Sequence, residues 1–166
     1  MFNLISALVS LVLMTSMALA DMSGSACILD GDTIMIDGIR RHGKCVNGVT
    51  VRLFGIDAPE LEQTCREPNG RLWQCGRASA GLLLRALDGQ FVVCKGAKSD
   101  DFGQILGVCH IDQNDVGAMM VRNGAALAFR EHSDDYLHDE DAARATRAGL
   151  WRGDFLPPWE WRKLHH

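Results

Sequence analysis

The sequence has no excess of basic residues. Of its 166 residues, 17 are Lys or Arg and 21 are Asp or Glu, so the formal net charge is -4 and the pI is near 5.8. Non-specific binding to nucleic acid depends on neutralising many phosphates with basic side chains. The composition therefore argues against a protein held on nucleic acid by a broad basic surface, and leaves room for a small local site.

The sequence also lacks internal repeats, low-complexity tracts and, after residue 20, any apolar run long enough to span a bilayer. Its content of 47% hydrophobic and 23% charged residues is that of an ordinary globular protein, not of a disordered chain or a coiled coil. We therefore expect a single domain over residues 21–166, with its core at about residues 27–151.

Residues 1–20 contain no charged side chain and end in the small-x-small site Ala18-Leu19-Ala20. This pattern predicts a signal peptide that is cut after Ala20, and so an exported protein, periplasmic or secreted, without stable membrane insertion. The first three residues lack the Lys or Arg that a signal peptide usually has. The alternative is an uncleaved N-terminal membrane anchor.

All six cysteines follow the predicted cleavage site, which in an exported domain indicates up to three disulfides. Of the fifteen full pairings, the local placement of the cysteines favours one set: Cys27 with Cys45, Cys65 with Cys75, and Cys94 with Cys109. The alternative is a zinc site, but the sequence has no Cys-x-x-Cys and no paired Cys/His spacing.

Short apolar and β-branched runs predict five strands, at 27–29, 33–37, 50–56, 90–95 and 105–111. Helical spacing of apolar residues and stop signals predict three helices, at 75–87, 115–122 and 133–148, the third capped by Ser133 and closed by Gly149. The tryptophan-containing tail after residue 151 is expected to pack back on the domain. The pattern fits a small Greek-key barrel with helices, and an α+β sandwich almost equally well.

Two acidic stretches about twenty residues apart carry the functional signal. They are Asp30-Gly31-Asp32-Thr33 and the segment 51–60, which contains Arg52, Asp57, Ala58 and Glu60. Carboxylates suit a divalent cation and an arginine suits an anion, so the combination suggests phosphate ester chemistry. Asp30 is expected to serve the turn through hydrogen bonds.

These residues resemble the thermonuclease family, whose best-known member is staphylococcal nuclease. The resemblance depends on Asp-Gly-Asp-Thr at 30–33, Arg-x-x-x-x-Asp-x-Pro-Glu at 52–60, and Val-Arg-Asn-Gly at 121–124. It implies a mainly β fold with α-helices, an OB-fold five-stranded Greek-key barrel with three helices. It also implies a Ca²⁺ site at Asp32, Asp57 and the carbonyl of Ala58, with Arg52 binding phosphate and Glu60 activating or orienting water.

One position departs from the family pattern. The family's second catalytic arginine follows a Tyr-Gly pair, and here that stretch is Asp101-Phe102-Gly103-Gln104. Gln104 carries no charge, so we expect slow catalysis unless another arginine fills the place. The candidates from the sequence are Arg66, Arg71 and Arg130.

The resemblance implies an exported, monomeric, calcium-dependent endonuclease that hydrolyses phosphodiester bonds of DNA or RNA, with single strands as the easier substrate. The alternative is a catalytically impaired OB-fold module that binds an oligonucleotide or a protein. The changes around Gln104 and the acidic pI favour the alternative, and the survival of Asp32, Arg52, Asp57 and Glu60 favours the enzyme.

Overall fold

A computed structural model describes residues 21–99 and 104–165 of the chain. The predicted signal peptide and the residues Asp101, Phe102 and Gly103 lie outside the described residues. None of the helices in the described part of the chain is both long and apolar enough to cross a bilayer.

The strands form one mixed sheet and three small two-stranded sheets. The main sheet has the order β1-β10-β11-β6-β3-β2, and β12 also pairs with β11. Its neighbouring strands are antiparallel except β11 and β6, which run parallel. The bounds are β1 (Met22–Gly24), β2 (Ala26–Ile28), β3 (Thr33–Ile36), β4 (Ile39–Arg41), β5 (Lys44–Val46), β6 (Val49–Leu53), β7 (Ile56–Asp57), β8 (Cys65–Arg66), β9 (Leu72–Trp73), β10 (Val92–Ser99), β11 (Ile105–Ile111), β12 (Asn114–Asp115) and β13 (Leu127–Ala128).

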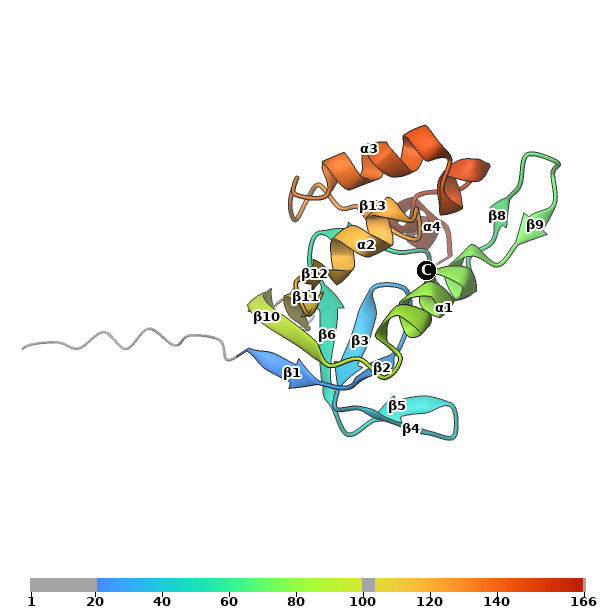
Figure 1. The fold of residues 1–166 in the computed structure, drawn as a ribbon. Helices are drawn as coiled ribbons and strands as arrows, with labels where there is room; N and C mark the ends of the chain where they lie inside the picture. The colour runs from blue at the N-terminus through green and yellow to red at the C-terminus, as the bar shows by residue number, and fades with distance from the viewer. Residues whose placement is uncertain (1–20, 100–103, 166) are drawn as a thin grey trace, which may run out of the picture.

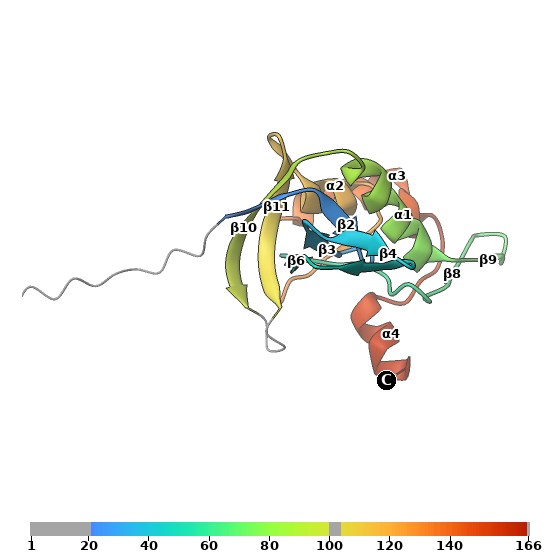
Figure 2. The same cartoon turned by 90° about the horizontal axis from the view of Figure 1, so that it is seen from below.

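The helices cover one side of this sheet, except the last, which projects from the opposite side (Figures 1 and 2). Their bounds are α1 (Cys75–Leu87), α2 (Val116–Arg122), α3 (Leu137–Thr146), the 3-10 helix η1 (Gly149–Arg152) and α4 (Pro158–His165). The predicted bounds of α1 are confirmed, and α2 begins one residue later than predicted, with Asp115 as its N-cap.

Two predictions about the C-terminal helices are wrong. The third helix begins at Leu137 and not after Ser133, whose hydroxyl instead accepts a hydrogen bond from the Asp135 amide and so forms a local turn. The helix ends at Thr146, its C-cap Arg147 has a left-handed conformation, and Gly149 opens η1. The tail then forms α4, a helix that the sequence analysis did not predict, so the described residues contain four α-helices where three were expected.

The core lies between the main sheet and helices α1 and α2. Ile34, Val51 and Leu53 from the sheet meet Leu83 of α1 and Met120 of α2, and each of these five side chains is at most 1% exposed. The helical spacing in α1 and the period-two alternation in β6 place these apolar residues on the inner faces. This packing holds the ends of β3 and β6 in fixed positions.

The favoured disulfide set is confirmed. Cys27 pairs with Cys45, Cys65 with Cys75, and Cys94 with Cys109, which leaves no free cysteine among the described residues. The stretch 38–48, between two predicted strands, contains the hairpin β4–β5, and the stretch 60–74 contains the pair β8–β9. A sheet-rich mixed fold with helices on it agrees with the OB-type fold that the resemblance implies.

Candidate active site

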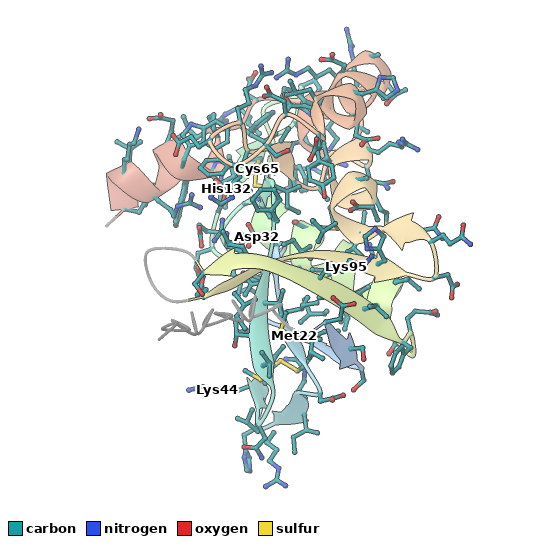
Figure 3. The ribbon with its side chains drawn as sticks, turned by 90° about the vertical axis from the view of Figure 1, so that its left-hand side faces the viewer. Met22, Asp32, Lys44, Cys65, Lys95 and His132 are labelled. Carbon is teal, nitrogen blue, oxygen red and sulfur yellow. A yellow bond between two sulfur atoms is a disulfide. The ribbon has the colours of Figure 1, made fainter. Side chains whose placement is uncertain are left out.

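Strand pairing brings the two acidic stretches together. In the antiparallel pair β3–β6, Thr33 lies opposite Arg52, so Asp32 lies beside the end of β6. The amide of Leu53 donates to the carbonyl of Asp32 over 2.8 Å. After a turn at Gly55, where φ is +76°, β7 presents Asp57 on the same side. Asp32 is labelled in Figure 3, near the centre of the molecule.

Asp32 is held by three different donors. Its Oδ1 accepts from the Thr33 hydroxyl at 2.9 Å, and its Oδ2 accepts from the Ala58 amide at 2.9 Å and from Arg52 Nη2 at 3.2 Å. The expected turn role of Asp30 agrees with the structure, since its Oδ1 accepts from the Asp32 amide at 3.0 Å. These bonds fix the carboxylate of Asp32 although it is only 4% exposed.

Arg52 and Asp57 form an ion pair at the centre of the cluster. Nη2 of Arg52 lies 2.7 Å from Oδ1 of Asp57 and also contacts Asp32, so oxygens of the two carboxylates converge on one nitrogen atom. Asp57 is completely buried, whereas the Arg52 side chain is 23% exposed. The arginine is therefore partly accessible to solvent, although its Nη2 atom contacts the buried carboxylates.

The loop after β7 places Glu60 at the rim of this cluster, with its side chain 31% exposed. The Glu60 carbonyl accepts from the Gln63 amide at 2.8 Å, and the fully buried Gln63 side chain donates to the carbonyl of Leu156 in the C-terminal tail at 2.8 Å. Gly76 of α1 packs directly against the Glu60 backbone. Gln63 thus positions Glu60 against both α1 and the tail, a role that sequence reasoning missed because a loop glutamine carries no distinguishing pattern.

A second arginine, Arg162 of α4, also enters the cluster and was not predicted. Its Nη1 donates to Asp57 Oδ1 at 3.0 Å and to Glu60 Oε1 at 2.8 Å, and its Nη2 donates to Asp57 Oδ2 at 2.9 Å. The side chain is 31% exposed. No sequence signal marked this residue, because it lies in a short tail outside the resemblance and 105 residues from Asp57.

The electrostatics of the cluster follow from burial and close opposite charges. Burial raises the pKa of Asp57, while hydrogen bonds and charge from Arg162 and Arg52 act against it. Burial would lower the pKa of Arg52, but Asp32 and Asp57 outweigh it and raise that pKa. Burial, reinforced by the charge of Asp32, raises the pKa of Asp30 to about 7.

Burial and opposite charges also act against each other on the pKa of Arg162. Burial alone would lower its pKa, but its hydrogen bonds to Asp57 and Glu60 raise it above the ordinary arginine value. Both guanidinium groups of the cluster are therefore charged throughout the physiological pH range.

The donor set suits a hard cation. Among the described residues, no group of three or more His, Cys, Asp or Glu side chains is arranged to hold a metal ion. The predicted set has two side chains, Asp32 and Asp57, and one carbonyl, that of Ala58. Converging carboxylate oxygens at the edge of a buried cluster are the ligands that Ca²⁺ prefers, so these residues fit the ion by their chemistry.

The other predicted positions lie elsewhere. Gln104 directly precedes β11, and Leu106, two residues on, pairs with Arg52. Gln104 therefore adjoins the end of β11 that pairs with β6. The candidate arginines have other partners: Arg66 binds the carbonyl of Gly70, Arg71 binds Glu67 and Arg130 faces Glu140.

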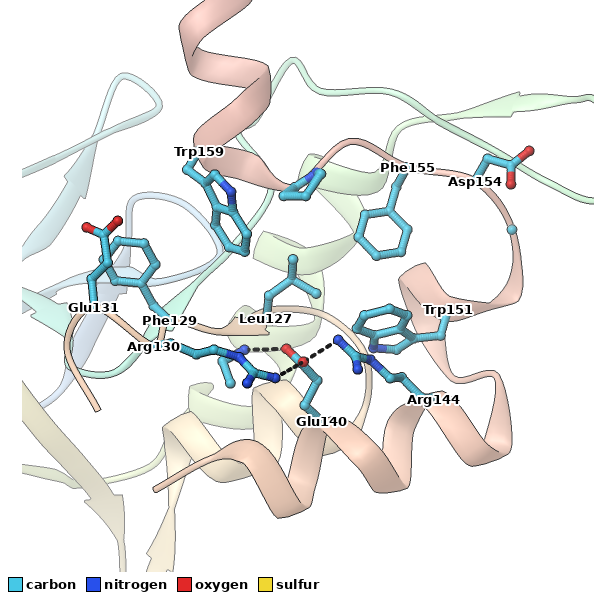
Figure 4. Close-up of a pocket in the computed structure, with 13 residues that line it drawn as sticks. Leu127, Phe129, Arg130, Glu131, Glu140, Arg144, Trp151, Asp154, Phe155 and Trp159 are labelled. Carbon is cyan, nitrogen blue, oxygen red and sulfur yellow. Dashed lines mark hydrogen bonds and ion pairs between the residues drawn. The ribbon is translucent and has the colours of Figure 1, made fainter. Parts of the chain in front are cut away.

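A cleft of about 690 Å³ lies between β13, α3 and the tail (Figure 4). Its lining includes Leu127, which pairs with Asp57 in β13–β7, and Trp159 of α4, which packs on Phe129 with ring centroids 5.9 Å apart. The expectation that the tail packs back on the domain is thus confirmed for Trp159. Glu140 at the cleft accepts from Arg144 at 2.6 Å, an ion pair marked in Figure 4.

Comparison with known proteins identifies the family. A family model described as "Staphylococcal nuclease homologue" matches residues 50–153, more than half of the chain, and the protein belongs to this family. The matched range contains Arg52, Asp57, Glu60 and Gln104, whereas Asp32 and Arg162 lie outside it.

Several relatives align with most of the chain. The succinoglycan biosynthesis protein ExoI of Rhizobium meliloti (strain 1021) is 32% identical over 153 residues, which cover 89% of this chain and 75% of that protein. An "Uncharacterized endonuclease" of Haemophilus influenzae is 28% identical over 166 residues, covering 92% of this chain and 85% of that protein. "Probable endonuclease LCL3" of Komagataella phaffii is 32% identical over 133 residues, covering 70% of this chain and 55% of that protein.

Proposed function

We propose that the protein is an exported calcium-dependent nuclease that hydrolyses phosphodiester bonds in DNA or RNA. Family membership and the endonuclease names of two relatives support a nuclease. The single observation that carries the proposal is the convergence of Asp32, Arg52 and Asp57 within hydrogen-bond distance, with Glu60 joined to the cluster through Arg162.

The chemistry of each site residue suggests a separate role in this reaction. Asp32, Asp57 and the Ala58 carbonyl would hold Ca²⁺, which when bound neutralises charge on phosphoryl oxygens. Arg52 is partly exposed beside the buried carboxylates and would bind a phosphate oxygen, stabilising charge in the transition state. Glu60, at the rim and partly exposed, would accept a proton from the attacking water or orient it.

Gln104 bears on the rate. An arginine that stabilises a phosphoryl transition state contributes about 10³–10⁵ in rate in comparable reactions. Glutamine donates hydrogen bonds but has no charge. We therefore expect slow cleavage unless an arginine from another position supplies the missing positive charge. Single strands are the expected substrate because their unpaired bases are accessible to an OB-type surface.

Glu60→Gln tests this proposal directly, because it keeps size and hydrogen bonding but removes the base. We expect calcium-dependent cleavage of single-stranded DNA or RNA by the wild-type chain, loss of that cleavage in chelator, and a rate about 10²–10⁴-fold lower in the variant. Glu62→Gln, two residues along the same loop, is the matched control and is expected to leave the rate unchanged. Cleavage that needs neither calcium nor Glu60 would contradict the proposal.

The second candidate is a binding module without catalysis, favoured by Gln104 and by the acidic pI. It predicts that the chain binds single-stranded oligonucleotide or a protein but does not cleave nucleic acid at any calcium concentration. The same cleavage assay, run beside a binding titration, separates the two candidates.

Export is part of the proposal and is supported by three disulfides in a small domain, since such bonds persist in oxidising compartments. We propose that residues 1–20 form a signal peptide and that a single, monomeric domain follows. N-terminal sequencing of the protein recovered from outside the cytoplasm, expected to begin at Asp21, tests the cleavage site.

A further inference from the structure

Arg162 binds two carboxylates of the site with geometry that also suits a phosphate. Its two terminal nitrogens donate to both oxygens of Asp57, at 3.0 and 2.9 Å. The Nη1 nitrogen also donates to Glu60 at 2.8 Å. A planar guanidinium fits a pair of phosphate oxygens as well as a pair of carboxylate oxygens. We propose that Arg162 is a substrate-binding arginine, which exchanges Asp57 and Glu60 for the phosphate of the nucleic acid. This inference rests on the nuclease function proposed above.

The charges of the cluster support the exchange. Three carboxylates (Asp32, Asp57, Glu60) face two guanidinium groups (Arg52, Arg162), which leaves one net negative charge. A divalent cation together with one phosphodiester group would bring the cluster to neutrality. Without Arg162 the cation-loaded cluster would be neutral, and the negative charge of the bound phosphodiester would be left uncompensated. The positive charge of Arg162 therefore neutralises the site when both the cation and the phosphodiester are bound.

Asp57 keeps one charged partner when Arg162 leaves it. Arg52 already pairs with it at 2.7 Å in the interior of the cluster. A cation bound at Asp57 would compete for the carboxylate oxygens that Arg162 now uses. The guanidinium group would then be released beside Glu60, where the phosphate of a substrate bound to Arg52 and the cation would lie.

The α4 helix allows this change of partner because it is anchored at its beginning and exposed at its end. Pro158 is buried, Trp159 packs on Phe129 in the cleft of Figure 4, and Leu156 just before the helix accepts from Gln63. Beyond Arg162 the helix is open to solvent, with Leu164 70% exposed, and Figure 2 shows it projecting from the body of the protein. The Arg162 side chain can therefore move without disturbing the core.

The matched variants are Arg162→Ala, Arg162→Lys and Lys163→Ala. In the cleavage assay with calcium, Arg162→Ala is expected to lower kcat by at least about 10²-fold, within the range seen for phosphate-binding arginines. Arg162→Lys keeps the charge but loses the pair of nitrogens that can bind two phosphate oxygens, so it should recover part of the rate. Lys163 is exposed on the same helix and binds Glu160, so Lys163→Ala should match the wild type. An Arg162→Ala rate equal to or above the wild-type rate would overturn the proposal, a faster one showing that Arg162 blocks the site.

Gln104→Arg gives a test by rescue. Because position 104 is two residues before Leu106, which pairs with Arg52, an arginine there is expected to approach the same phosphate. The double variant Gln104→Arg with Arg162→Ala should regain at least tenfold in kcat over Arg162→Ala alone. No gain, combined with a normal fold by circular dichroism, would count against a shared role.

Binding measurements test Arg162 without cleavage. In the Glu60→Gln background with calcium, adding Arg162→Ala should weaken binding of a single-stranded oligodeoxynucleotide about tenfold or more, and reduce the salt dependence by about one phosphate contact. Calcium affinity, measured by calorimetry, should be equal to or higher than that of the wild type. Unchanged oligonucleotide binding, or weaker calcium binding, would show that Arg162 only positions Asp57. Because this test needs no turnover, it separates failure of this inference from failure of the nuclease proposal.

Discussion

Gly31 lies where the turn before β3 comes closest to α1 and to the segment after β7. A Cβ atom at this position would lie 2.7 Å from the Cβ of Ala58 and 3.0 Å from the Cβ of Ser79. Ser79 is itself fixed by a 2.7 Å hydrogen bond from its hydroxyl to the carbonyl of Ala125. The absence of a side chain at Gly31 therefore allows Asp32 and Ala58 to approach each other, which the candidate calcium site requires.

Gly31→Ala should lower the free energy of unfolding by about 1–3 kcal/mol, because the surrounding atoms cannot move apart without cost. Thermal or urea unfolding measures the change. Gly81→Ala is the control: this helical position has room for a methyl group, and alanine there should raise stability by about 0.5–1 kcal/mol. Equal effects of the two changes would show that the close approach at Gly31 is unimportant.

At the scale of elements, a partly buried polar contact connects the start of α2 to the start of α3. Asp115 caps α2 by accepting from the Ala118 amide at 3.0 Å, and its other oxygen accepts from the Tyr136 hydroxyl at 3.0 Å. Tyr136 is 5% exposed. Burial, then the charge of Asp115, raises the pKa of this tyrosine above its ordinary value. The contact joins the two helices that flank the last part of the core.

The chain has a single tyrosine, so the ultraviolet absorbance of tyrosinate reports Tyr136 alone. We expect its titration in the folded protein to have a midpoint above pH 10, and in urea to return to about pH 10. Since the pKa is higher in the folded state, stability is fully retained below about pH 10 and is lost as pH rises through the folded-state pKa.

Asp115→Asn should bring the midpoint down, because it removes the charge, while asparagine still caps the helix. Asp115→Ala should have the same effect on the titration and in addition cost about 1 kcal/mol of stability through the lost cap. A native midpoint at the ordinary tyrosine value would contradict the burial and hydrogen bond described for Tyr136.

At the scale of the whole molecule, the three disulfides hold different parts of the fold. Cys27–Cys45 joins β2 to the hairpin β4–β5 across 18 residues, away from the candidate site. Cys65–Cys75 closes a shorter segment of 10 residues and attaches the loop that follows Glu60 to the first residue of α1. The first bond should therefore matter for stability, and the second for both stability and the position of Glu60.

Replacing Cys27 and Cys45 with serine should lower the free energy of unfolding by about 3 kcal/mol, the amount expected for a loop of this length, and leave kcat nearly unchanged. Replacing Cys65 and Cys75 should cost somewhat less stability but lower kcat as well. Urea unfolding and the cleavage assay, run on both double variants, give the comparison. If both pairs change kcat equally, the loop attachment does not control Glu60.

Much of the fold and part of the site could be predicted from sequence. The bounds of α1 follow from the spacing of Leu83 and Leu87, and the disulfides follow from which cysteines lie near one another along the chain. The start of α3 could not be predicted because Ser133 satisfies a local turn instead of a helix amide. Serine does favour the N-cap position of helices, but here the local hydrogen bond to the Ser133 hydroxyl forms a turn instead of a cap.

The sequence by itself determined the residue types of the candidate site and the order of the elements that carry them. Asp32, Arg52, Asp57 and Glu60 lie in short motifs, and strand pairing between neighbouring segments brings such motifs together with little ambiguity. The tertiary structure alone decided that Arg162 joins them. Its contact with Asp57 spans 105 residues and depends on where a short tail docks, through Trp159 and Gln63, on surfaces that the rest of the fold provides. No local periodicity encodes such a contact, because its energy comes from burial and charge complementarity between distant parts of the chain.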